Sequence, residues 1–99
     1  MKWELLKIVP APKGSKSKYV AHFTDGTKTK KTSFGARGYL DYTQHRSVKR
    51  RDAYRARAEH NLKKTKDPTK ASYLAYWILW GDSTSLRKNI ADYRKKFNL

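Results

Sequence analysis

The residues best suited to chemistry in this sequence are closely spaced arginines and lysines near its middle. Six of them fall within one short stretch, at Arg46, Lys49, Arg50, Arg51, Arg55 and Arg57. A guanidinium group can hold a phosphate or a guanine edge through two parallel hydrogen bonds, whereas an ammonium group is a less directional point charge. Only Asp52 and Glu59 lie among or beside these cations, so most of their charge is available to a partner outside the chain. The cluster predicts contact with a polyanion.

A second group of cations lies earlier in the chain, where lysine and threonine alternate. The β-branched threonines of this run favour an extended strand, one face of which is strongly cationic. The predicted nucleic-acid-binding residues of the whole chain are Lys28, Lys30, Lys31, Arg46, Lys49, Arg50, Arg51, Arg55, Arg57, Lys63 and Lys64. Three aromatic residues near this charge, Tyr39, Tyr42 and Tyr54, are candidates for contact with bases or sugars, although packing is their favoured role.

Histidines and carboxylates give a weaker indication of chemistry. The three histidines lack the i, i+4 spacing of a helical zinc motif, and the chain contains no cysteine. Asp41 and His45 are four residues apart and could serve a small phosphoryl-transfer enzyme. A turn in which Asp41 accepts a hydrogen bond and His45 packs or caps is the favoured interpretation. No adjacent carboxylates suit magnesium, so we predict a non-enzymatic protein with no catalytic residues, metal or cofactor.

The net charge supports a polyanionic partner more strongly than any single motif. The 99 residues include 24 Lys and Arg against 8 Asp and Glu, which gives a formal charge of +16. A net charge of about 2 to 8 keeps a small domain soluble, and a larger charge opposes compaction through self-repulsion. The excess lies in residues 13–31, 43–66 and 86–99, whose net charges are +5, +7 and +4. Retention of so much charge predicts nucleic-acid binding.

Composition limits the class of protein further. With 37% hydrophobic and 13% aromatic residues, the chain has too many Tyr, Trp and Phe for a disordered basic tail. Its longest apolar run, Tyr73–Trp80, is much shorter than the roughly 20 residues of a membrane-spanning helix. The acid at Glu4 does not fit a secretory signal. We expect one folded cationic domain over residues 1–99, with no membrane partner.

Three strands are predicted to begin the domain as an antiparallel meander. Residues 3–9 are rich in strand-forming side chains, and residues 18–24 alternate between apolar and polar ones. Asp25–Gly26 is a strong hairpin signal, which places the third strand at residues 27–34.

Three helices are predicted to follow, which makes the fold class α+β. The first spans residues 48–62 with Ser47 as its cap. The second spans residues 68–80 and is apolar on every side, so it should lie at the centre of the core. The third spans residues 84–97 and has a regular apolar face. The predicted core consists of Phe23, Phe34, Trp77, Ile78, Leu79, Trp80, Leu86, Ile90, Tyr93 and Phe97.

Three stretches carry a resemblance to a known family. They are Phe34–His45, with the pattern Phe-Gly-x-x-Gly-Tyr-x-Asp-Tyr-Thr-x-His, the arginine-rich segment ending Tyr54-Arg-Ala-Arg57, and Tyr76–Trp80 followed by Ser85–Tyr93. Over about residues 18–97 the chain resembles small basic proteins of nucleocytoplasmic large DNA viruses, including giant viruses of amoebae such as the marseilleviruses. The resemblance supplies no catalytic residues. It implies a viral protein that accompanies a large DNA genome, in the virion and in the cytoplasm or nucleus of the infected host.

The predicted function is therefore binding of nucleic acid, DNA rather than RNA, mainly through phosphate contacts from Lys and Arg. Two alternatives stay open. One is a structural protein of the virion whose cations meet acidic partner proteins, and the other is a small nuclease-like enzyme. A homodimer and contacts with other virion proteins also stay open.

Overall fold

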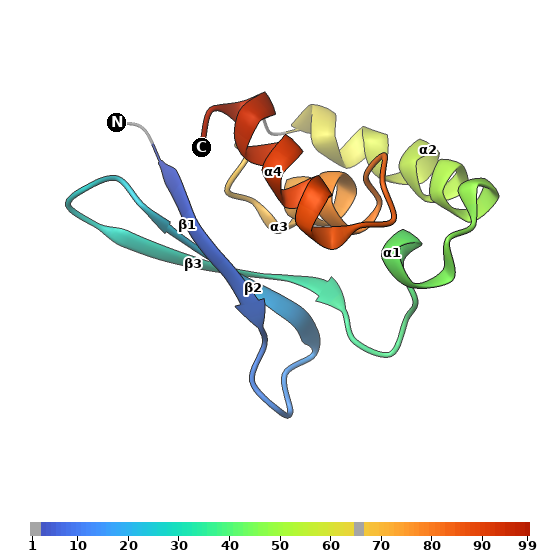
Figure 1. The fold of residues 1–99 in the computed structure, drawn as a ribbon, viewed down its shortest axis with the longest axis horizontal. Coiled ribbons are helices and arrows are strands. Elements are labelled where there is room, and N and C mark those ends of the chain that lie inside the picture. The colour runs from blue at the N-terminus through green and yellow to red at the C-terminus, as the bar shows by residue number, and fades with distance from the viewer. Residues whose placement is uncertain (1–2, 65–66) are drawn as a thin grey trace.

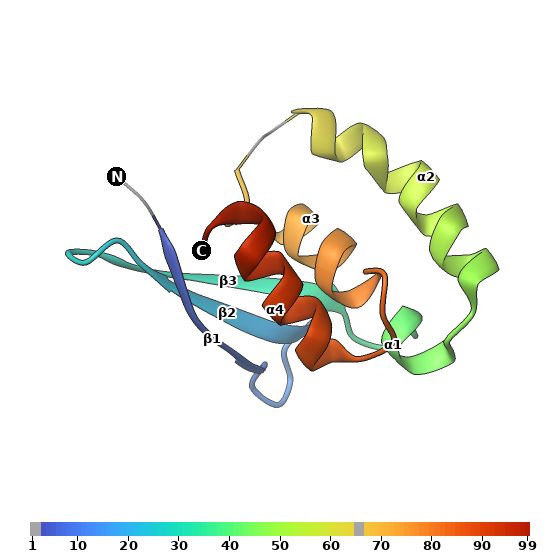
Figure 2. The same ribbon diagram turned by 45° about the horizontal axis from the view of Figure 1, so that its top comes forward.

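The computed structural model describes residues 3–64 and 67–99, apart from the side chain of Asn61, and it confirms the predicted α+β fold. The elements in chain order are β1 (Glu4–Pro10), β2 (Ser17–Thr24), β3 (Thr29–Ala36), α1 (Tyr42–His45), α2 (Val48–Lys64), α3 (Ala71–Leu74), the π-helix η1 (Ala75–Leu79) and α4 (Leu86–Phe97). The strands form one antiparallel sheet in the order β1-β2-β3. The helices gather on one side of this sheet, and α2 lies beyond α3 and α4 as the outermost helix (Figures 1 and 2).

Strand pairing separates an inner face of the sheet from an outer one. Phe23 of β2 lies opposite Leu5 of β1 and Lys30 of β3. Directly opposed residues share a face, so these three point toward the helices, where Phe23 and Leu5 are buried. The next row, Lys7–His22–Lys31, lies on the outer face, which none of the helices in the described ranges covers (Figure 1).

The core lies between the inner face of the sheet and the helices. Phe23, Phe34, Ile78, Leu79 and Tyr93 are buried there as predicted. The other five predicted residues surround them as partly buried side chains, namely Trp77, Trp80, Leu86, Ile90 and Phe97. The apolar segment before Gly81 therefore contributes to the core, but its two tryptophans reach the surface.

Among the predicted boundaries, the starts of the third strand and of the helix at 68–80 move because turns occupy the residues in question. The third strand begins at Thr29, because Asp25 Oδ1 accepts hydrogen bonds from the backbone N–H groups of Thr27 and Lys28 and draws both into the turn. The predicted helix at 68–80 begins at Ala71, because Asp67 Oδ1 accepts from the Thr69 N–H at 2.9 Å and closes a turn there. The same segment widens into a π-helix from Ala75 onward.

Asn89 of α4 closes the end of this π-helix. Its side chain is 2% exposed, and its Nδ2 donates to Ile78 O at 2.9 Å and to Ser83 O at 2.7 Å. Its Oδ1 accepts from the Ser83 N–H at 3.1 Å. One amide thus satisfies backbone groups at a helix end that would otherwise be buried without partners. Gly81 must be small here, because a Cβ would lie 2.3 Å from Trp77 O.

Replacing Asn89 with Ala should lower the free energy of unfolding by about 2–3 kcal/mol, because it leaves buried backbone groups unpaired. Urea denaturation followed by circular dichroism measures this loss. Lys95→Ala, at an exposed position of the same helix, is the control and should cost less than about 0.5 kcal/mol. Equal costs for the two variants would contradict the role given to Asn89.

Candidate nucleic-acid interface

The helix α2 is anchored by its inward side. Ser47 caps its first turn as predicted, since Ser47 Oγ accepts from the Arg50 N–H at 3.3 Å. The Tyr54 ring stacks on Trp80 with centroids 4.2 Å apart and planes 9° from parallel. Burial raises the pKa of Tyr54 above its ordinary value. Near the other end of the helix, the Tyr73 hydroxyl donates to Leu62 O at 3.3 Å. One side of α2 is therefore fixed to the domain and the other is left to solvent.

The solvent side of α2 carries most of its positive charge. Five cations there are exposed, and among the described residues none of them is in an ion pair: Lys49, Arg50, Arg57, Lys63 and Lys64. At about 100° per residue they fall within roughly 140° of the helix circumference. We call these five residues the α2 basic face. Arg46, also exposed, lies just before the helix in a left-handed conformation with φ 59°.

Two predicted contact residues of the same helix, Arg51 and Arg55, also make contacts within the chain. Arg55 donates from Nε to Trp80 O at 2.8 Å. Its guanidinium also pairs with the Asp82 carboxylate at 2.9 Å, and the hydrogen bond to this carboxylate lowers the pKa of Asp82. Arg51 pairs with Asp52 at 3.1 Å and lies over the Tyr42 ring, 5.0 Å from its centroid. Arg51 and Arg55 are therefore the members of the cluster whose charge is paired within the chain.

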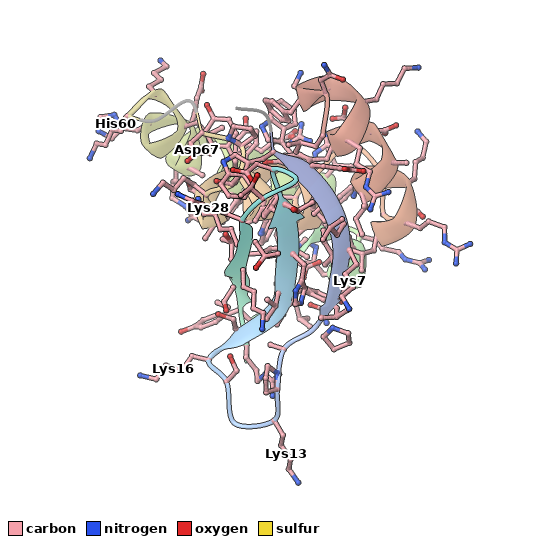
Figure 3. All side chains as sticks on the ribbon, turned by 90° about the vertical axis from the view of Figure 1, so that its left-hand side faces the viewer. Lys7, Lys13, Lys16, Lys28, His60 and Asp67 are labelled. Carbon is pink, nitrogen blue, oxygen red and sulfur yellow. The ribbon has the colours of Figure 1, made fainter. Side chains whose placement is uncertain are left out.

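The lysines of the third strand do not join the α2 basic face. Lys30 lies on the inner face, where its Nζ donates to Thr69 Oγ1 at 2.6 Å and lies 3.9 Å from Asp67 Oδ2. Lys31 lies on the outer face of the sheet, and Lys28 is exposed at the hairpin turn. Figure 3 shows Lys13 and Lys16 extending from the β1–β2 loop, at the opposite end of the view from His60 of α2. The positive charge therefore covers several surfaces, and among the described helices α2 carries the largest number of cations.

Asp41 and His45 have separate structural roles. Asp41 is 3% exposed, caps α1 by accepting from the Thr43 N–H at 2.9 Å, and pairs with Lys18 at 2.7 Å. His45 accepts at Nδ1 from the Ser47 N–H at 2.9 Å, and its ring lies 5.2 Å from that of Trp80. The two side chains make no hydrogen bond to each other in the described part of the chain. Asp41 thus accepts hydrogen bonds within a turn and His45 packs beside it, as the favoured interpretation of the sequence predicts.

A cleft that the sequence did not indicate lies beside the α2 basic face. Two adjoining hollows of about 500 and 440 Å³ share four lining residues, Tyr39, Leu40, Arg57 and Trp80. We call this the Tyr39–Arg57 cleft. Arg50 and His45 line its second hollow. The Tyr39 and Leu40 side chains are 74% and 57% exposed, in the loop between β3 and α1. Exposed apolar groups beside a hollow often mark a binding site.

Comparison with known protein families gives one match. A family of unknown function, DUF5754, matches over residues 6–58, which is more than half of the chain. The chain belongs to DUF5754. No curated protein and no solved structure matches it.

The DUF5754 segment contains the sheet except for Glu4 and Leu5 of β1, the loop with Tyr39, α1 and the first part of α2. Arg50 and Arg57 of the α2 basic face and His45 of the cleft therefore fall inside it, whereas Trp80, which also lines the cleft, lies outside. Of the three tyrosines considered for base contact, Tyr42 is buried and Tyr54 is stacked on Trp80, so both pack. Of these three tyrosines, Tyr39 is the exposed one.

Within residues 3–64 and 67–99, no three His, Asp or Glu side chains come together in a way that could hold a metal ion. None of the helices in the same ranges is long and apolar enough to cross a membrane.

Proposed function

We propose that this protein binds nucleic acid without catalysing a reaction on it, and that it does so mainly by placing the α2 basic face against phosphates. The observation that carries the proposal is the set of five exposed cations on one side of the outermost helix, with no carboxylate paired to them among the described residues. Unpaired guanidinium and ammonium groups on one surface attract a polyanion and release its counterions.

DNA is the nucleic acid we propose, because the sequence resembles proteins of large DNA viruses. In that setting the protein would accompany the viral genome in the virion or in the infected cell. The contacts available from α2 are phosphate contacts, since no residue of the α2 basic face differs from its neighbours in a way that marks it as a base reader. We therefore expect weak sequence selectivity.

The double variant Arg50→Gln/Arg57→Gln tests the proposal. Both residues are exposed, and Gln preserves helix propensity, so the fold should survive. Affinity for a fully paired DNA duplex should fall at least about tenfold, which corresponds to about 1.4 kcal/mol. Fluorescence anisotropy with a labelled duplex measures it. Arg51 and Arg55 are left unchanged, because they hold α2 against Tyr42, Trp80 and Asp82.

The matched control is Arg87→Gln/Lys95→Gln, which removes the same charge from exposed positions of α4. It should change the affinity about twofold or less, because these cations lie outside the proposed interface. Equal losses in the two double variants would show that only total charge matters and would contradict an interface on α2. Absence of duplex binding by the unaltered protein would favour acidic protein partners instead.

A further inference from the structure

The Tyr39–Arg57 cleft has a lining that a phosphate-binding surface does not need. Its shared residues combine two aromatic rings, an aliphatic side chain and one guanidinium, Tyr39, Trp80, Leu40 and Arg57. Phosphate contacts require only the cation. Aromatic faces beside a cationic rim are the combination that holds unstacked bases of single-stranded nucleic acid. The volumes of the two hollows, about 500 and 440 Å³, lie within the range of small-ligand pockets.

The loop that presents Tyr39 is held at both ends. Gly35, at φ 82°, has no room for a Cβ, which would lie 2.8 Å from Leu79 Cδ1. The Arg37 N–H donates to Lys16 O at 2.9 Å. Asp41 then fixes the far end through its cap on α1 and its pair with Lys18. The backbone on both sides of Tyr39 is thus held by its neighbours, and this lowers the entropy cost of ordering the loop when a ligand binds.

His45 adds a hydrogen-bond donor without an acceptor. Its Nδ1 accepts from the Ser47 N–H, so the proton of the neutral imidazole is on Nε2. That Nε2 atom is buried and has no hydrogen-bond partner within the described residues. His45 belongs to the lining of the hollow that also contains Arg50 and Arg57. A buried donor without an acceptor is costly, so His45 brings an unsatisfied polar group to the wall of this hollow.

We propose that the Tyr39–Arg57 cleft binds one unstacked nucleotide, with its base against Tyr39 and its phosphate on Arg50 and Arg57. This rests on the proposed function and narrows it to nucleic acid that has unpaired positions. A base within a duplex is stacked on both faces and cannot meet Tyr39. The α2 basic face contacts paired and unpaired strands alike, so the cleft provides the preference for an unpaired position.

The experiment compares two DNA duplexes of equal length, one fully paired and one with a short central mismatch that contains 2-aminopurine. Because the duplexes have equal numbers of phosphates, electrostatic attraction is closely matched between them. The unaltered protein should bind the mismatched duplex about tenfold more tightly and quench the 2-aminopurine fluorescence by stacking. Tyr39→Ala should remove both effects while leaving affinity for the paired duplex within about twofold.

Two further variants make the result specific. Tyr39→Phe retains the ring and should preserve both the preference and the quenching. Leu6→Ala removes another exposed apolar side chain, 47% exposed on β1, and should change neither. Equal affinity for the two duplexes, or a preference that persists in Tyr39→Ala, overturns the nucleotide-binding role of the cleft but leaves phosphate binding by α2 intact. Failure to bind either duplex overturns both proposals.

Discussion

Replacing Phe23 with Ala should lower the free energy of unfolding by about 3–5 kcal/mol. The Phe23 side chain is 0% exposed and lies between the inner face of the sheet and the helices, in a cluster that includes Leu5, Ile78 and Tyr93. Its removal leaves a cavity that neighbours on several elements would have to fill together. A domain of this size has about 5–15 kcal/mol of stability in total, and the self-repulsion of a +16 chain opposes folding further.

Urea denaturation followed by tryptophan fluorescence is the suitable measurement. Urea is preferable to guanidinium chloride, because a salt denaturant would screen the charge repulsion that forms part of the balance. Leu6→Ala is the matched control, since Leu6 lies in the bulge of β1 and is 47% exposed. It should cost less than about 1 kcal/mol. A loss that small for Phe23→Ala would show that the two-layer core is wrongly assigned.

Much of the fold follows from local sequence signals. Asp25–Gly26 joins β2 and β3, Ser47 begins α2, and the apolar face of α4 packs on the core. Features that depend on tertiary contacts did not follow from local signals. The widening of the apolar helix into η1 places Trp80 against Tyr54 of α2, and the closing contact comes from Asn89. Tyr54 and Asn89 both lie more than one helical turn from the segment that they contact, so the hydrophobic periodicity of that segment could not indicate either contact.

The sequence indicated the candidate nucleic-acid interface only in part. Charge counting located α2, because charge is a property of composition and survives folding. It did not separate Arg50 and Arg57 from Arg51 and Arg55, because that division depends on where Trp80, Asp82 and Tyr42 come to lie. Tyr54, Ala58 and Leu62 recur every four residues as a narrow apolar stripe on α2, and the direction in which this stripe faces indicates part of that division. Arg51 and Arg55 lie on the same side of the helix as this stripe, and Arg50 and Arg57 lie at its margin.

The second large effect concerns ionic strength. Six exposed cations are available between residues 46 and 64, namely Arg46, Lys49, Arg50, Arg57, Lys63 and Lys64. Each phosphate that such a cation neutralises releases condensed counterions from duplex DNA, so the observed affinity falls as a power of the salt concentration. Six such contacts give a slope of log affinity against log salt of about −5.

Affinity for a fully paired duplex should therefore fall about a thousandfold between about 50 and 200 mM salt. Anisotropy titrations at several salt concentrations give the slope directly. Arg50→Gln/Arg57→Gln should make it shallower by about 2, because two phosphate contacts are lost. Arg87→Gln/Lys95→Gln removes the same charge from α4 and should leave it unchanged. A slope near zero would contradict phosphate binding altogether. The slope of log affinity against log salt counts the cations that contact phosphate, not the total charge of the protein. A steep slope that both double variants reduce equally would therefore place phosphate contacts on α4 as well as on α2.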